Sequence, residues 1–212
     1  MAHILITSGP TRQYLDPVRY LTNASSGRMG AALATAALEH GHRVTIVSGP
    51  VEVEYPAGVE LIPVVTTPEM MEAAAAVFAE ADGLIGAAAP CEYMPRKVES
   101  SKMSKTGQAL HLELVETPDI VATLGSSKKL HQWVVGFALE TDDVRFRSIV
   151  KMSKKCCDMI VSNRAEAMNS DQNSVEILYR DGQVLEQIDG PKLVVARAIL
   201  GWIEKRLIKE LL

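Results

Sequence analysis

The sequence predicts an α/β fold, a three-layer sandwich in which helices cover both faces of a mainly parallel sheet. The first observation behind this prediction is that short apolar runs alternate with longer segments of helical periodicity along residues 3–163. The second is a pair of apolar runs around Asp181–Gly182, a dipeptide that strongly favours a tight hairpin. We therefore expect a parallel sheet followed by a C-terminal β-hairpin.

The N-terminal half supplies four expected strands, at residues 3–9, 42–49, 59–65 and 83–89. Helical periodicity predicts helices from about Ser25 to Glu39 and over residues 68–81. Residues 90–107 follow, a polar stretch with two prolines and no periodicity. Loops of this length are uncommon in compact domains unless they act as lids or binding segments.

The C-terminal half predicts strands at 109–115, 131–140 and 158–163, and helices at 118–126 and 141–156. Two more strands form the hairpin of residues 174–188, and the tail from Pro191 to Leu212 has the spacing of a helix that packs on the core. Because no repeat, linker or low-complexity segment interrupts the pattern, residues 1–212 are expected to form a single domain.

Composition narrows the classes of partner. Lys plus Arg number 22 and Asp plus Glu 26, a net charge of −4, so neither nucleic acid nor an anionic membrane is an expected partner. No apolar run approaches the roughly 18 residues of a membrane span, and we expect a cytoplasmic protein. The three cysteines and five histidines lack the spacing of a disulfide framework or a zinc site.

Ligands of open α/β sheets bind outside the carboxyl ends of the strands, and the unusual segments of this chain fall there. Residues 23–30, NASSGRMG, form a polar turn before a helix, where backbone N–H groups can bind an anion. A plain helix N-cap by Ser or Asn is the alternative. A nicotinamide dehydrogenase is disfavoured, because the G-x-G-x-x-G fingerprint and the acidic residue after the second strand are both missing.

Three further segments are candidates for binding. Lys102 and Lys105 lie in the long loop that also contains Glu92, Arg96 and Lys97. Lys151 and Lys155 are spaced to share one helix face, where they can neutralise a polyphosphate or serve only as surface charges. Residues 162–173 follow a buried strand and suggest substrate contact only in combination with the other segments.

Together these segments resemble phosphopantothenoylcysteine synthetase, in the CTP-using form of bacterial coenzyme A biosynthesis. The resemblance covers nearly the whole chain, and its strongest parts are ITSGPTR, LDPVRYLTNASSGRMG, TPDIV, VVGFALET, KMSKK and MNSDQN. In most bacteria this synthetase is fused to a flavin-dependent decarboxylase. The resemblance therefore implies a Rossmann-like fold, a homodimer, and a decarboxylase on a separate chain or a missing half.

The activity that the resemblance implies is a two-step ligation. The carboxylate of 4′-phosphopantothenate attacks the α-phosphate of CTP and releases pyrophosphate, with Mg²⁺ on the triphosphate. The amine of L-cysteine then displaces CMP from the acyl-cytidylate. Catalysis of this kind depends mainly on positioning and on charge neutralisation.

The resemblance also implies residue roles. Asn23 matches a catalytic Asn of the second step, and Lys102 matches a lid lysine needed to form the intermediate. The nucleotide and its phosphates would contact a larger set, namely Ser25, Ser26, Gly27, Gly86, Ala87, Ala88, Glu92, Lys102, Pro118, Asp119, Ile120, Val121, Phe137, Lys151 and Lys155. No metal ligand is assigned.

One position departs from the family. The family normally has Ala-Asp-Tyr where this chain has Cys91-Glu92-Tyr93, and the added methylene displaces the carboxylate by about one bond length. Two other functions stay open at this point. One is an NADP-dependent reductase on a similar fold, and the other is a nucleotide-binding module with weak or no turnover.

Overall fold

A computed structural model describes residues 1–140, 143–164 and 172–209, and its centre is an eight-stranded sheet. The strands lie in the order β12-β11-β10-β9-β6-β1-β4-β5. Their bounds are β1 (His3–Ser8), β4 (Arg43–Ser48), β5 (Glu60–Pro63), β6 (Gly83–Gly86), β9 (Trp133–Glu140), β10 (Met159–Arg164), β11 (Gln172–Tyr179) and β12 (Val184–Pro191). Neighbouring strands from β10 to β5 pair in parallel, whereas β11 and β12 pair antiparallel. The α/β prediction is confirmed.

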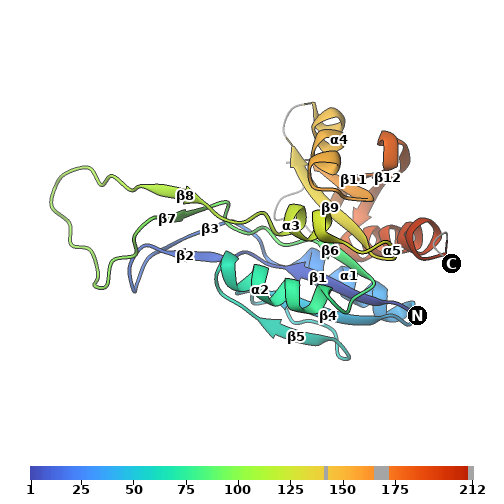
Figure 1. The fold of residues 1–212 in the computed structure, drawn as a ribbon, viewed down its shortest axis with the longest axis horizontal. Coiled ribbons are helices and arrows are strands. Elements are labelled where there is room, and N and C mark those ends of the chain that lie inside the picture. Colours follow the sequence, from blue (N-terminus) through green and yellow to red (C-terminus); the bar gives the residue numbers. More distant parts are fainter. Residues whose placement is uncertain (141–142, 165–171, 210–212) are drawn as a thin grey trace.

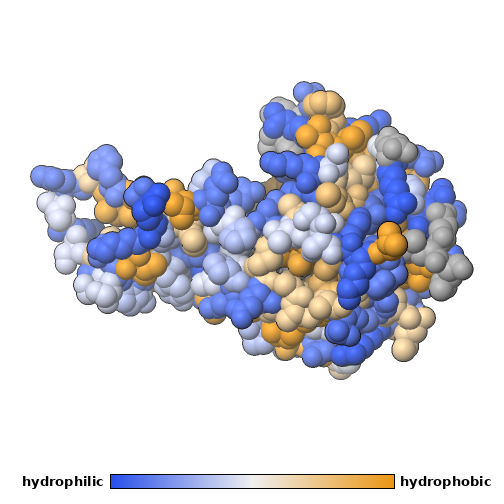
Figure 2. All heavy atoms as spheres, in the orientation of Figure 1, coloured by the Kyte–Doolittle hydropathy of each residue, from blue (hydrophilic) through white to orange (hydrophobic). Residues whose placement is uncertain are grey.

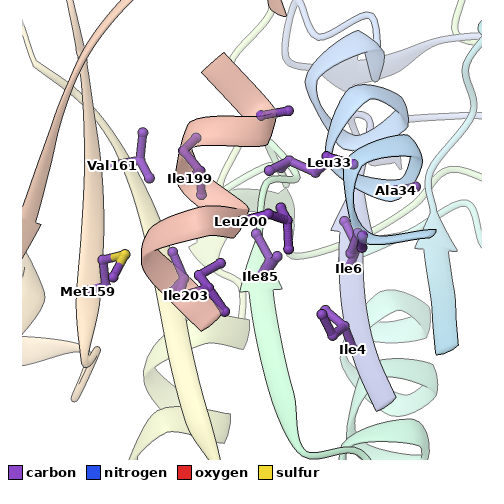
Figure 3. Packing of buried hydrophobic residues seen from close by; sticks show 14 of the residues in the cluster. Ile4, Ile6, Leu33, Ala34, Ile85, Met159, Val161, Ile199, Leu200 and Ile203 are labelled. Carbon is purple, nitrogen blue, oxygen red and sulfur yellow. The ribbon is translucent and has the colours of Figure 1, made fainter. Parts of the chain in front are cut away.

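Helices cover both faces of this sheet (Figure 1). One layer holds α1 (Arg28–Glu39) and α5 (Lys192–Ile203), and the other holds α2 (Thr67–Phe78), α3 (Ile120–Ser127) and α4 (Val144–Lys154). Successive strand residues point to opposite faces. Ile4 and Ile6 therefore pack with the first layer (Figure 3), and Leu5 packs with the second. Each face of the sheet therefore has its own apolar core.

The chain order creates a switch point between β1 and β6. From β1 the chain passes through α1 to β4 on one side, and later through α3 to β9 on the other side of β6. The register pairs Ile4 with Gly83, so the two strands end close together. Loops leaving such a pair diverge and open a crevice at the carboxyl edge of the sheet, the usual ligand position in doubly wound folds.

An arm projects from this carboxyl edge (Figure 1). It is built from β2 (Arg12–Tyr14) paired with β3 (Tyr20–Thr22), and β7 (Tyr93–Pro95) paired with β8 (Leu114–Glu116), with residues 15–19 and 96–113 connecting them. Because β2 follows β1 and β7 follows β6, both hairpins start at the switch point. The first helix is thus held away from the first strand by a structured hairpin.

The carboxylate of Asp16 ties the two hairpins of the arm together. It is fully buried and accepts hydrogen bonds from the backbone N–H groups of Val18 at 2.8 Å and Met103 at 3.1 Å. The Arg19 guanidinium pairs with the same carboxylate and also donates to the Met103 carbonyl. Burial alone would raise the pKa of Asp16, but the N–H donors outweigh it and lower the pKa. The long loop is therefore anchored at its midpoint.

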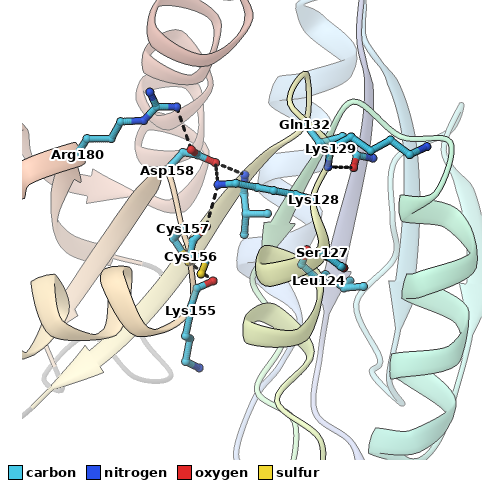
Figure 4. Close-up of polar contacts among 11 residues, drawn as sticks. Leu124, Ser127, Lys128, Lys129, Gln132, Lys155, Cys156, Cys157, Asp158 and Arg180 are labelled. Atoms are coloured by element: carbon cyan, nitrogen blue, oxygen red, sulfur yellow. Dashed lines mark hydrogen bonds and ion pairs between the residues drawn. The ribbon is translucent and has the colours of Figure 1, made fainter.

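At the opposite, amino edge of the sheet, Asp158 joins three segments (Figure 4). Its carboxylate lies 2.6 Å from Lys128 Nζ and 2.9 Å from Arg180 Nη2, and it accepts a 2.9 Å hydrogen bond from the Val134 backbone N–H. Asp82 acts similarly, accepting a 2.7 Å bond from the His3 N–H. Both carboxylates are thus satisfied within the protein.

Several predicted boundaries need correction. The first helix begins at Arg28, not near Ser25, because Gly27 adopts a left-handed φ of 74°. The strand expected over 109–115 is only β8, and the hairpin turn is a short 3-10 helix at 180–182 instead of a two-residue turn. The C-terminal helix is confirmed and continues as a π-helical turn over Glu204–Ile208. Residues 141–142, 165–171 and 210–212 lie outside the described part of the chain.

Candidate functional site

The Ser25-Ser26-Gly27 turn is shaped by its glycine. Besides the positive φ, a Cβ on Gly27 would lie 2.9 Å from Val51 Cγ1, so no side chain fits there. The Gly27 carbonyl accepts a 3.3 Å hydrogen bond from Ser8 Oγ at the end of β1. No side chain caps α1, so an N-cap by Ser or Asn, the alternative for this turn, is wrong.

A pocket of about 230 Å³ opens between this turn and the start of α5. We call it the α1–α5 pocket. Its walls are the turn and first residues of α1, the small residues after β6, the end of β9, and three polar side chains from the following segments. Its lining consists of residues 24–30, 87–89, 137–139, Asn163, Asn173 and Lys192. The expected Ser25, Ser26, Gly27, Ala87, Ala88 and Phe137 are brought together here.

The two helices that begin at this pocket lack the usual N-terminal partners. Neither α1 nor α5 has a side-chain cap or an acidic residue in its first turn. In α2, by contrast, Thr66 and Glu69 form a complete capping box. Free N–H groups at a helix start favour an anion. The α1–α5 pocket therefore lies at the starts of two helices that have no side-chain cap.

The polar wall of this pocket is formed by residues from β10, β11 and α5. Lys192 Nζ lies 2.6 Å from Asn173 Oδ1, and Asn173 is only 4% exposed. The side-chain oxygen of Asn163 is enclosed, and among the described residues no group donates a hydrogen bond to it. Asn163 and Asn173 belong to the segment 162–173 singled out in the sequence. Lys192 was missed, because a lysine that follows Pro191 at the start of a helix forms no recognisable motif.

Two further hollows lie on the other side of the Ser25–Ser26 backbone. Their volumes are about 320 and 610 Å³, and both are lined by Arg12, Ser25, Ser26 and Pro50. Arg28 lines the larger one, and the Arg12 guanidinium stacks 4.6 Å from the centre of the Tyr20 ring. These two arginines were also missed, because neither forms a recognisable motif. The turn thus separates the α1–α5 pocket from an arginine-lined groove.

Asn23 lies at the root of the arm, where its amide bridges β3 to the segment after β6. Its Nδ2 donates to the carbonyls of Ala89 and Pro90 at 3.3 and 3.0 Å. The side chain is exposed, and these two bonds point Oδ1 away from the carbonyls. Asn23 can therefore offer a hydrogen-bond acceptor to a ligand while its donor holds the local backbone.

A second group of expected residues gathers on the α2–α4 face. Asp119 caps α3 by accepting a 3.0 Å bond from Ala122 N–H, and its other oxygen lies 3.1 Å from Lys155 Nζ. Lys151 lies one turn earlier on α4 and is half-buried. A Cβ on Gly86 would lie 2.5 Å from Val121 Cγ2, so Gly86 allows α3 to pack on β6. The structure brings these predicted residues together, but none of them lines the α1–α5 pocket.

The remaining residues of the expected site occupy less central positions. Ile120 is buried in the second core, and Pro118 is exposed beside the α3 cap. Glu92 is exposed just before β7, and its backbone carbonyl accepts a 2.9 Å bond from Thr117 N–H. Lys102 is exposed next to the anchored Met103. Both charged residues therefore belong to the arm and not to the pocket.

In residues 1–140, 143–164 and 172–209, no group of three or more His, Cys, Asp or Glu side chains is arranged to hold a metal ion. Within the same ranges, no helix is both long and apolar enough to cross a membrane.

Comparison with known proteins gives the family. The model of the DNA/pantothenate metabolism flavoprotein C-terminal domain matches residues 1–207. The chain belongs to this family. The resemblance inferred from the sequence is thereby confirmed at the level of the family, and the NASSG turn and the α1–α5 pocket are features of a DNA/pantothenate metabolism flavoprotein C-terminal domain.

Two curated relatives of this C-terminal domain are the coenzyme A biosynthesis bifunctional proteins CoaBC of Bacillus subtilis and Escherichia coli. The B. subtilis protein is 42% identical over 203 residues, which cover 93% of this chain and 50% of the relative. The E. coli K12 protein is 39% identical over 199 residues, covering 91% and 49%. The chain thus spans about half the length of both.

Solved structures agree with the fold of this C-terminal domain. A crystal structure of the C-terminal domain of CoaBC has a TM-score of 0.82 at 37% identity, covering 98% of this chain and 96% of that one. The DNA/pantothenate metabolism flavoprotein from Streptococcus pneumoniae has a TM-score of 0.85 at 20% identity, covering 97% and 99%. The Rossmann-like α/β architecture with its C-terminal hairpin is confirmed.

Proposed function

We propose that this chain is a phosphopantothenate–cysteine ligase that uses CTP. It joins 4′-phosphopantothenate to L-cysteine and cleaves CTP to CMP and pyrophosphate. The observation that supports this most is the placing of the NASSG turn, the small residues after β6 and the end of β9 around one pocket at the carboxyl edge. Membership in the family and the names of the coenzyme A biosynthesis relatives support it further.

In the proposed first step, an oxygen of the phosphopantothenate carboxylate attacks the α-phosphorus of CTP. A P–O bond to the acyl group forms, and the bond to the departing pyrophosphate breaks. The helix end at Gly27 and the lysines Lys102, Lys151 and Lys155 are assigned to the phosphates, where positive charge stabilises the transition state and the leaving group. Ala87, Ala88 and Phe137 are assigned to the nucleotide.

In the proposed second step, the amine of cysteine attacks the acyl carbon and CMP leaves. The Oδ1 of Asn23 accepts a hydrogen bond from the incoming amine, because Nδ2 already donates to the Ala89 and Pro90 carbonyls. The amide thus holds the nucleophile beside the activated acyl group, an effect of orientation. Water must be kept out during this step, since it hydrolyses the intermediate, and the loop of residues 96–113 is assigned to that role.

Mg²⁺ is proposed to enter with the triphosphate. This ion keeps several waters and is usually held by substrate phosphates with one or two carboxylates. Glu92 is an exposed carboxylate at the correct edge, and Asp119 is already paired with Lys155. The donor set therefore fits an ion carried by the nucleotide better than a resident one, and no residue is assigned as its ligand.

We also propose that residues 1–212 form one domain and that two copies associate through the arm. The arm exposes apolar side chains that association with a second copy would bury (Figure 2). These are Val18, Tyr20, Tyr93, Val98, Leu110, Leu112 and Leu114. The β11–β12 hairpin, by contrast, extends the molecule's own sheet. Sedimentation velocity of the wild type and of Leu112→Asp tests the dimer, with a shift toward monomer expected for the variant.

The deciding experiment supplies phosphopantothenate and cysteine with CTP, ATP, GTP or UTP in turn. We expect pyrophosphate release that requires phosphopantothenate and is fastest with CTP, and product that requires cysteine. Preference for ATP would overturn the nucleotide assignment. Binding of CTP without pyrophosphate release would indicate a binding module, and retention of a reduced nicotinamide cofactor through purification would indicate a reductase.

A further inference from the structure

We propose that the hollow of about 320 Å³ beside Asn23 binds the cysteine substrate, and that the Arg12 guanidinium holds its α-carboxylate. Arg12 and Asn23 line the same hollow, so an amino acid there has its carboxylate on one residue and its amine on the other. The inference rests on the proposed function, which places the incoming amine at Asn23 Oδ1. It adds the residue that selects an α-amino acid over a simple amine.

The fold restrains the guanidinium of Arg12 by stacking. Arg12 is half-buried on β2, where its backbone pairs with Thr22 of β3, the residue before Asn23. Its guanidinium lies 4.6 Å from the centre of the Tyr20 ring, which packs edge-on against Tyr14. Among the described residues, the guanidinium forms no ion pair with a carboxylate. Stacking fixes the plane of a guanidinium and leaves the N–H groups at its edge able to donate to a ligand.

The chemistry of the hollow matches a small carboxylate. Its lining contains Arg12 and, among the described residues, no acidic side chain, whereas Glu52 lines the larger neighbouring hollow. A guanidinium binds a carboxylate through two parallel N–H···O bonds, a geometry that an ammonium group does not offer. The volume of about 320 Å³ lies at the lower end of the range of small-molecule sites, which suits a ligand with few atoms.

The hollow is placed for the second step of the proposed reaction. Asn23 Nδ2 donates to the carbonyls of Ala89 and Pro90 at 3.3 and 3.0 Å, which leaves Oδ1 as the acceptor for an amine. Lys151 and Lys155, to which the phosphates of the nucleotide are assigned, belong to α4 and its C-cap and do not line this hollow. The amino acid therefore has a place of its own, apart from the lysines assigned to the phosphates.

Steady-state ligation with two amines tests the inference. L-Cysteine has the α-carboxylate and cysteamine lacks it, and both are supplied with saturating CTP and phosphopantothenate. Arg12→Met is expected to lower kcat/KM for L-cysteine by about ten- to a hundred-fold, as for loss of a charged hydrogen bond. The kcat/KM for cysteamine should keep its wild-type value. Pyrophosphate release in the absence of either amine should also be unchanged, because the first step uses no amino acid.

Two further variants separate charge from geometry and from folding. Arg12→Lys keeps the charge but loses the paired donors, so we expect kcat/KM for L-cysteine to lie between those of the wild type and Arg12→Met. Arg43→Met is the matched control, because it removes an exposed arginine whose partner is Glu60, at 3.1 Å, on the neighbouring strand β5. Thermal unfolding confirms that each variant is folded, and Arg12→Gln replaces Arg12→Met if that protein is unstable.

The comparison of the two amines decides the outcome. If the Arg12 variants lose the same factor in kcat/KM with L-cysteine and with cysteamine, or release pyrophosphate more slowly, the arginine acts on another substrate or on the arm and the inference is wrong. Unchanged kinetics with L-cysteine also overturn it, and the proposed function then stays intact. A wild type that forms no phosphopantothenoylcysteine with any nucleotide overturns the proposed function, and the inference with it.

Discussion

Two groups of polar atoms, one at each edge of the same parallel sheet, differ in how their hydrogen-bonding capacity is satisfied. At the amino edge, Asp158 has three partners and Asp82 accepts a backbone N–H. At the carboxyl edge, two helices begin without caps and the Asn163 Oδ1 has no described donor. Both edges are formed by the ends of the same strands, so strand composition does not explain the difference.

This difference between the edges distinguishes residues that stabilise the fold from residues that can bind a ligand. A buried charge that is surrounded by partners fixes the segments that it joins, but it has nothing left to offer a ligand. Uncapped helix ends and an acceptor without a described donor cost stability, and a bound ligand can supply the missing hydrogen bonds. Substitutions at the amino edge should therefore change the free energy of unfolding, and those at the carboxyl edge should change binding or turnover.

The largest effect is expected for Asn23→Asp. The carboxylate cannot donate to the Ala89 and Pro90 carbonyls, and it is repelled from them. We expect pyrophosphate release to survive and amide formation to fall by about a hundred- to a thousand-fold, as for loss of a positioned polar group. Quenched-flow assays that measure pyrophosphate and phosphopantothenoylcysteine separately check this. Gln183→Glu, the same change at the β11–β12 turn, is the control, and full product at the normal rate would refute the role of Asn23.

Asp158→Ala is the corresponding test of the amino edge. It leaves the Lys128 ammonium and the Val134 N–H without their common acceptor, so we expect a loss of about 2–3 kcal/mol in the free energy of unfolding. Urea denaturation measures this, with exposed Asp189→Ala as a control expected to change stability by less than about 0.5 kcal/mol. The CTP affinity of the folded variant should equal that of the wild type, and a weaker one would show that the edges are coupled.

Acid should release the long loop of the arm by protonating Asp16. Asp16 has a lowered pKa, so its contacts are fully present above the unfolded value of about 3.9 and are lost as the pH falls through the lower folded value. We expect pulsed hydrogen exchange, corrected for intrinsic rates, to show residues 96–113 losing protection below about pH 4 while β9 and β10 stay protected. In Asp16→Asn, this step should be absent, and an unchanged step would assign it to another group.

The smallest effect concerns the two buried thiols. Burial raises the pKa of Cys157 to about 12, and it also raises the pKa of Cys91. Cys91 Sγ lies 3.4 Å from the Leu21 carbonyl at the root of the arm, where local opening is enough to expose it. With iodoacetamide and mass spectrometry we expect exposed Cys156 to react first, then Cys91, then Cys157. Simultaneous reaction of the last two would show that the edges open together.

Much of the sheet was predictable because its strands are short apolar runs between helical segments, a local pattern. The arm was not, since the polar stretch after β6 gives no sign that Tyr93–Pro95 would pair with residues 114–116. The start of the first helix was predicted three residues too early, near Ser25, because Ser is a common N-cap residue. The helix begins at Arg28 because Gly27 before it has a left-handed backbone conformation. The sequence predicted that Ser25, Ser26 and Gly27 belong to the site. It did not predict Arg12, Arg28 or Lys192, because the fold brings them to the turn through contacts between segments distant in sequence.

The α1–α5 contact has a consequence for the order of events during synthesis. Arg197 on α5 forms a bidentate pair with Glu39 on α1, at 2.8 and 2.7 Å, across 158 positions of sequence. A nascent chain that has exposed the NASSG turn still lacks the opposite wall of the pocket until α5 has left the ribosome. A ligand that needs both walls of the pocket can therefore bind only after α5 has packed on α1, so a helix far along the sequence decides when the NASSG turn becomes part of a two-walled pocket.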